Sequence, residues 1–188
     1  MKVNENYGLY LFKKESESEN SLKEMLQFLK SQTVFKHSNF SYIEAQTSLH
    51  PHLSLIENLQ MELGKMTWEE LPSYLSKELQ GLVNLVTNPN ITACEAQTWE
   101  KFLVSFVKGT LLPTKNLVID INEATLSPFL IQKFKKNILE ATQFKSVYLA
   151  TANTSLWLDC AHSIVGRNGY EFSVEALGSE LVRKNWAS

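Results

Sequence analysis

Cysteine and long apolar runs are scarce in this chain of 188 residues. Cys94 and Cys160 are the only two cysteines, and their spacing suits neither a disulfide framework nor a metal site. No apolar run is long enough to span a bilayer, and no secretory leader is recognisable. We therefore expect a cytoplasmic protein with reduced thiols, which reaches the inner face of a membrane only through a partner.

An excess of charge of either sign is also missing. Lys and Arg number 18 against 20 Asp and Glu, so the formal net charge is -2, and no basic run is present. Nucleic acid is therefore not an expected partner. The length suits one domain, residues 1–188, with a sizeable core.

Glycine is rare, with seven in the chain, and none lies in the loop 13–21. A predicted strand over 7–12, this loop and a predicted helix over 21–30 together form the frame of a phosphate-binding loop. Such a loop needs glycines, a Lys and a Ser or Thr. Here Asn20 stands where the Lys would be, before Ser21. Three glutamates would repel a phosphate, each by roughly 1 kcal/mol in water and up to about 4 in a shielded cleft. The plainer interpretation, which we favour, is a solvated acidic loop that caps a helix.

The segment 115–128 organises the rest of the sequence. Leu117, Val118 and Ile119 suit a strand that is buried on both faces, as in a parallel sheet. Asp120 then falls at the carboxyl end of that strand, where ligands bind in open α/β sheets. A turn and an amphipathic stretch follow.

The other periodic segments alternate between strand and helix. We predict strands over 40–43 and 147–151 and a closing hairpin from 163–165 and 170–174. Helices are predicted over 55–63, 92–108 and 130–142, with one or two more in 68–85, a short helix over 155–161 and a helical tail over 175–186. Ser54 with Glu57, and Thr92 with Glu95, form capping-box pairs at two helix starts. This order predicts an α/β fold with a mainly parallel sheet. We expect residues 1–52 and 109–188 to form the α/β core and residues 53–108 an inserted helical subdomain.

This order of parts resembles the ATP-binding subunit of ABC transporters over nearly the whole chain. Residues 41–46, followed by 50–59, are similar to that family's glutamine loop and the helix after it. Residues 91–97 lie where the family has its Leu-Ser-Gly-Gly signature. Residues 117–128 are similar to its second nucleotide motif, in which Asp120, Leu126 and Pro128 match. The resemblance implies a P-loop NTPase-like fold whose small antiparallel subdomain is reduced.

The departures from the family pattern fall on groups that grip and hydrolyse ATP. Ile121 occupies the position of the catalytic Glu, and an isoleucine cannot accept a proton. Ala152 occupies the position of the switch histidine, and Ala93 and Cys94 replace signature glycines. Phosphoryl transfer depends on positioning and on neutralising the transferred group. The resemblance therefore implies a pseudo-ATPase with no catalytic residue, no cofactor and no metal. Its vestigial nucleotide positions are Asn20, Ser21, Gln46 and Asp120.

In that family, the glutamine loop lies near the cleft that receives the coupling helix of the permease. The resemblance therefore implies partner contacts from Gln46, Leu49, His50, His52 and Leu53. Leu55, Ile56 and Leu59 suit the core face of the following helix instead. The two histidines have no third ligand nearby, so we read them as surface residues rather than metal ligands. The implied partner is an ABC permease, an intact ATPase subunit, or both.

Two other interpretations stay open. Asp120 still ends its strand, so the chain could be a weakly active or non-standard nucleotide-binding ATPase, and magnesium and ATP would then raise its melting temperature. Alternatively, it is a free-standing interaction module, including a homodimer, with no connection to a transporter.

Overall fold

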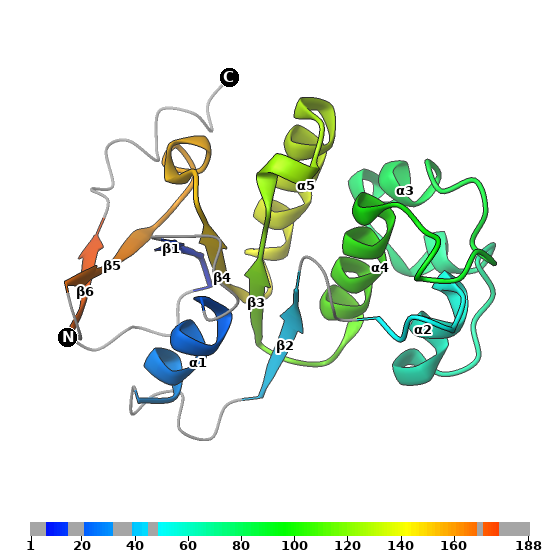
Figure 1. Ribbon diagram of the computed structural model, residues 1–188, viewed down its shortest axis with the longest axis horizontal. Coiled ribbons are helices and arrows are strands. Elements are labelled where there is room, and N and C mark those ends of the chain that lie inside the picture. The colour runs from blue at the N-terminus through cyan, green and yellow to red at the C-terminus, as the bar shows by residue number, and fades with distance from the viewer. Residues whose placement is uncertain (1–6, 15–20, 32–38, 45–48, 169–170, 177–188) are drawn as a thin grey trace.

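The computed structural model describes residues 7–14, 21–31, 39–44, 49–168 and 171–176 (Figure 1). Its centre is a six-stranded sheet in the order β2-β3-β4-β1-β5-β6. Five strands run parallel, and β6 is antiparallel to β5. The strands are β1 (Leu9–Lys13), β2 (Phe40–Ile43), β3 (Asn116–Asp120), β4 (Ser146–Thr151), β5 (Ser163–Asn168) and β6 (Glu171–Ala176). The predicted α/β fold with a mainly parallel sheet is confirmed.

Helices cover both faces of this sheet. They are α1 (Ser21–Ser31), α2 (Leu55–Leu63), α3 (Lys77–Val83), α4 (Thr98–Leu111) and α5 (Pro128–Ala141). The described residues also include the short 3-10 turns η2 (Leu71–Tyr74), η3 (Glu123–Thr125) and η4 (Thr154–Leu156). Within the part of the chain that the structure describes, no helix combines the length and the hydrophobicity needed to cross a membrane.

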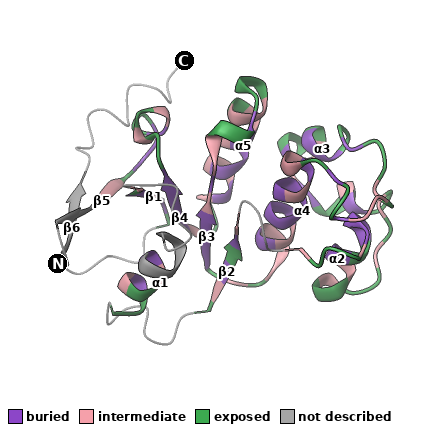
Figure 2. Ribbon diagram, in the orientation of Figure 1, coloured by how far each residue is buried: buried purple, intermediate pink, exposed green. Residues whose placement is uncertain are grey.

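Successive side chains of β3 pack on opposite faces of the sheet, which explains why both faces are covered. Leu117 and Ile119 of β3 join the larger core cluster, whereas Val118 between them joins a smaller one with Met25 and Leu29 of α1. All three strand residues are fully buried (Figure 2). The prediction of a strand buried on both faces is therefore confirmed, as expected for a parallel sheet between helices.

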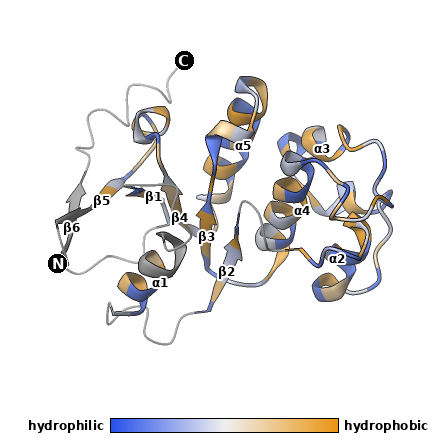
Figure 3. Ribbon diagram, in the orientation of Figure 1, coloured by the Kyte–Doolittle hydropathy of each residue, from blue (hydrophilic) through white to orange (hydrophobic). Residues whose placement is uncertain are grey.

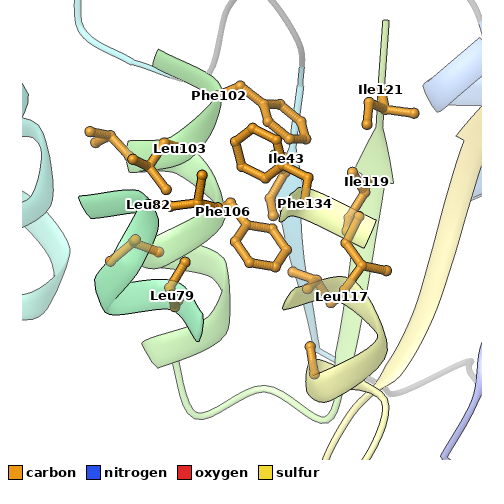
Figure 4. Close-up of a cluster of buried hydrophobic side chains, with 14 of the residues drawn as sticks. Ile43, Leu79, Leu82, Phe102, Leu103, Phe106, Leu117, Ile119, Ile121 and Phe134 are labelled. Atoms are coloured by element: carbon orange, nitrogen blue, oxygen red, sulfur yellow. The ribbon is translucent and has the colours of Figure 1, made fainter. Parts of the chain in front are cut away.

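The larger core continues from the sheet into the helical segment. Phe134 of α5 packs edge-on against Phe102 and Phe106 of α4, with ring centroids 4.8 and 6.1 Å apart. Figure 4 shows these three rings in one cluster with Ile43 of β2 and Leu82 of α3. Apolar residues follow one side of α4 and α5, and polar residues the other (Figure 3). The division at residues 53 and 108 stays a prediction.

The start of α2 was predicted correctly, but the start of α4 was not. Ser54 and Glu57 form the complete capping box of α2, which spans Leu55–Leu63 as predicted. Thr92 and Glu95 do hydrogen bond, at 2.5 Å, yet the helix begins only at Thr98. The intervening backbone is engaged elsewhere, because Ala93 N–H donates to the Leu53 carbonyl at 2.9 Å. A capping pair therefore formed in a turn rather than in a helix.

Two further predictions for the last third of the chain need correction. The predicted helix over 155–161 is the 3-10 turn η4, and Glu175 and Ala176 belong to β6 rather than to a helical tail. The rest of that tail lies outside the described residues. Among the described strands, the one antiparallel pair is β5–β6, which extends the main sheet.

Candidate functional site

The carboxyl ends of β1, β3 and β4 meet at one edge of the sheet. Asp120 of β3 lies in register with Ala150 of β4, and Lys13 of β1 with Thr151 of β4. The chain then leaves β1 across the end of β4, where Lys14 N–H donates to the Thr151 carbonyl at 3.0 Å. This edge therefore gathers the end of the first strand, Asp120 and Thr151. It is the edge at which ligands bind in open α/β sheets.

Lys14 reaches over β4 to the end of β3. Its ammonium group forms an ion pair with the Asp120 carboxylate, and the two side chains are only 7% and 21% exposed. The same ammonium donates to the Ile121 carbonyl oxygen at 3.0 Å. Asp120 is therefore neutralised by a cation of its own chain, and a metal ion would have to displace Lys14 to bind it.

Burial raises the pKa of Asp120, and Lys14 opposes that rise through its hydrogen bond and its charge. The carboxylates of Glu44 and Glu123 raise this pKa further. Among the described residues that act on this pKa, Lys14 is the one cation, and it faces the carboxylates of Asp120, Glu44 and Glu123. Their combined negative charge is unfavourable for a phosphate chain.

Glu123 is also committed to internal partners. Its Oε1 atom accepts hydrogen bonds from the Thr151 hydroxyl and from Trp157 Nε1, the latter at 3.2 Å. The Thr151 hydroxyl in turn accepts from Asn153 N–H at 3.1 Å. Thr151 and Trp157 are fully buried. Glu123 therefore holds η3 and the η4 turn against the end of β4.

The positions that the family resemblance associates with catalysis hold apolar side chains. Ile121 is fully buried and belongs to the larger core cluster. Its N–H donates to the Ala150 carbonyl at 3.1 Å. Ala152 follows β4 and is exposed. Neither side chain can transfer a proton.

A second surface, the loop 49–54, carries most of the predicted partner contacts. The Asn58 side chain is buried inside it and makes four hydrogen bonds to its backbone. Asn58 Oδ1 accepts from His50 N–H at 2.6 Å, and Nδ2 donates to the carbonyls of His50, Leu53 and Ser54 at 3.1, 3.2 and 2.9 Å. The Cys94 N–H also donates to the Pro51 carbonyl at 2.9 Å. The loop therefore has a defined backbone conformation.

On this fixed backbone, the histidines and leucines lie differently. His50 and His52 are exposed, with ring centroids 6.1 Å apart in an edge-to-face arrangement. Leu49 is half-buried and packs against the larger core, and Leu53 is also half-buried. Leu55, Ile56 and Leu59 are buried core residues, as predicted. The exposed side chains of this loop are thus those of His50, Pro51 and His52.

The predicted nucleotide positions are only partly described. Asn20 and Gln46 lie outside the described residues, and Ser21 begins α1. Asp120 lies at the sheet edge as predicted. In the part of the chain that the structure describes, no three His, Cys, Asp or Glu side chains come together in a metal-binding group.

Sequence reasoning missed Lys14 and Glu123. Lys14 follows β1, which pairs with β4, and β4 pairs with β3, so Lys14 reaches the carboxylate at the end of β3. Recognising this required the order of the strands, which no local pattern gives. Glu123 lies three residues after Asp120, but its role depends on Trp157, from a different segment.

No protein-family model and no curated protein matches this sequence. Solved structures match its fold. An ATP-binding subunit of an ABC transporter has a TM-score of 0.68 at 15% identity, over 90% of this chain and 79% of that one. An ATP-binding cassette in a dimeric, post-hydrolysis state with ADP and phosphate has a TM-score of 0.70 at 13% identity, over 95% of this chain and 89% of that one. An ABC transporter assigned to the metal-chelate type, in an inward-facing conformation, has a TM-score of 0.67 at 12% identity, over 93% of this chain and 74% of that one.

At these identities the likeness concerns the fold. The chain has the α/β fold of ABC ATPases, with a five-stranded parallel sheet and flanking helices.

Proposed function

We propose that this protein is a catalytically inactive, ABC ATPase-like subunit that binds, assembles or regulates an ABC-type membrane transport system. The observation that carries the proposal is the ion pair between Lys14 and Asp120, followed directly by the buried Ile121. The carboxylate at the end of β3 is neutralised internally, and the next side chain cannot act as a base.

The signature segment supports the same interpretation. The N–H groups of Ala93 and Cys94 donate to carbonyls of the loop 49–54. Backbone N–H groups that bind phosphate must be free to face it. Here two of them hold a neighbouring loop in place, and the Cβ atoms of both residues occupy space that glycines would leave open.

The proposed partner is an ABC permease, an intact ATPase subunit, or both, and the loop 49–54 is the proposed contact. His50 and His52 project from a backbone that Asn58 has already fixed. A preorganised loop loses less conformational entropy on binding. On this proposal the protein is cytoplasmic and lies at the inner face of the membrane through its partner.

The catalytic part of the proposal is tested with the full chain, magnesium and ATP. We expect no saturable ATP binding by calorimetry and no phosphate release above that of an Asp120→Asn variant. The contrasting function, a weak or non-standard ATPase, predicts turnover that Asp120→Asn abolishes. Such turnover would overturn the proposal.

The partner is tested by affinity purification from native membranes under mild detergent. We expect recovery of a permease or an ATPase subunit, and loss of that recovery in a His50→Ala/His52→Ala variant. Met61→Ala is the matched control, because Met61 is 65% exposed on the adjoining α2. Recovery of neither component, together with a homodimer in solution, would favour a free-standing module.

A further inference from the structure

A hollow of about 230 Å³ opens where η2 and α3 approach α4 and α5. Its apolar wall comes from Leu75, Leu79, Phe106 and Leu111. Figure 4 shows Leu79 and Phe106 where α3 and α4 face each other. The hollow lies on a different part of the molecule from the Lys14–Asp120 pair, and nothing in the proposed function uses it.

One lining residue carries a polar atom that has no partner among the described residues. Asn137 of α5 is 3% exposed, and its Nδ2 donates to the Lys133 carbonyl at 2.8 Å. Its Oδ1 is buried without a hydrogen-bond partner among the described residues. A buried acceptor left unpaired costs stability. A ligand N–H or O–H group would satisfy this oxygen once the side chains that cover it move aside.

A carboxylate lines the same hollow. Glu140 follows Asn137 by three residues on α5, so both line the same face of the helix and the same hollow. Glu140 Oε2 accepts from the Ser76 hydroxyl at 2.6 Å, which leaves further acceptor capacity on the carboxylate. No Lys, Arg or His is among the lining residues.

Two exposed aromatic side chains complete the lining. Tyr74 is 61% and Phe144 50% exposed. Aromatic faces attract organic cations, especially where acidic oxygens are close. Oxygen acceptors, negative charge and aromatic rings thus occur together, and no lining side chain carries a positive charge.

We propose that this hollow binds a small organic ammonium compound. The ammonium group donates to Asn137 Oδ1 and Glu140, and the hydrocarbon part packs on Leu79 and Phe106. A bound ligand touches both the η2–α3 segment and α5, so it adds to the existing Ser76–Glu140 link between them.

The test uses the full chain, with 2-phenylethylammonium as the probe and 2-phenylethanol as its neutral counterpart. Amide chemical shifts from isotope-labelled protein locate and quantify binding. We expect saturable binding with shifts around residues 137–144, and about tenfold weaker binding of the alcohol, because its O–H can still donate a hydrogen bond but carries no positive charge to attract the Glu140 carboxylate. Equal affinity for both probes would overturn the proposal, as would no saturation by the ammonium probe at millimolar concentration.

Matched variants locate the site. Glu140→Gln and Asn137→Leu should each weaken the ammonium probe about tenfold, and Phe144→Ala several-fold. Phe129→Ala is the control, because Phe129 is 55% exposed on the same helix but lies outside the hollow. Wild-type affinity in both Glu140→Gln and Asn137→Leu, or equal losses in Phe144→Ala and Phe129→Ala, would contradict the assignment.

Discussion

At the carboxyl edge of the sheet, polar side chains bond to groups far away in the sequence. Lys14 forms a hydrogen bond with Ile121, which lies 107 residues later in the sequence, and Glu123 forms one with Trp157, which lies 34 residues later. In the helical segment 53–108, Ser54, Asn58 and Gln80 bond to groups no more than eight residues away. The polar contacts at the sheet edge thus depend on the assembled fold, whereas the side-chain hydrogen bonds of Ser54, Asn58 and Gln80 are made within their own local segments.

The largest effect should come from breaking the long-range pair. Lys14→Met leaves the Asp120 carboxylate largely buried without its cation, and we expect a loss of about 2–4 kcal/mol in the free energy of unfolding. The double variant Lys14→Met/Asp120→Asn should recover most of this lost free energy. Urea denaturation measures the free energy of unfolding of both variants. The control is Lys135→Met, which breaks the more exposed Lys135–Asp159 pair and should cost under about 1 kcal/mol.

If Lys14→Met proved as mild as Lys135→Met, the sheet edge would not depend on its ion pair, and the main support for the proposed function would be lost.

A somewhat smaller effect should follow from removing the local support of the loop 49–54. Asn58→Ala removes four hydrogen bonds from a buried position, and we expect a loss of about 2–3 kcal/mol. Hydrogen exchange at His50 should also accelerate, because its N–H donates to Asn58 Oδ1. Asn84→Ala, at the exposed end of α3, should change stability by less than about 0.5 kcal/mol. Unchanged exchange at His50 would show that the loop is held by other contacts.

The third effect concerns the contact between α4 and the sheet. A Cβ atom on Gly109 of α4 would lie 2.8 Å from Leu117 Cδ1 and 3.0 Å from Ile43 Cδ1. We expect Gly109→Ala to cost about 1–2 kcal/mol by overpacking. Gly81→Ala in α3 meets no atom within 4 Å and should stabilise by roughly 0.5–1 kcal/mol. Thermal unfolding of both variants measures the difference, and equal shifts would contradict the tight contact.

The smallest effect should be a pH dependence confined to the sheet. His162 Nδ1 accepts from Leu9 N–H at 3.1 Å, and desolvation lowers the pKa of His162 below its ordinary 6.5. The unfolded chain then binds more protons, so this contribution is present above pH 6.5 and is lost as the pH falls through the folded value.

We expect a loss of no more than about 0.5 kcal/mol, because the ring is partly exposed. His162→Asn keeps an acceptor and removes the titration, so its stability should change less between pH 7.5 and 5.5 than that of the wild type. If the stability of His162→Asn fell between pH 7.5 and 5.5 as much as that of the wild type, His162 would not be the source of this pH dependence.

The difference between contacts that are local in sequence and contacts between distant segments explains what the sequence could predict. The bounds of α2 were correct because Ser54, Glu57 and the apolar spacing all lie within a few residues. Asp120 at a strand end was correct for the same reason. The Lys14–Asp120 pair could not be predicted, because it depends on β4 lying between β1 and β3. The start of α4 was wrong because Ala93 bonds to a distant loop, which the Thr92–Glu95 pair cannot reveal.

The strand order has a consequence for how the polypeptide matures. Leu9 of β1 pairs with Val147, and Tyr10 with Ser163, so both flanks of β1 are completed only by late segments. Until these emerge from the ribosome, β1 exposes two unsatisfied edges that can pair with other chains. Nascent or truncated forms that stop before β4 should therefore aggregate or engage chaperones.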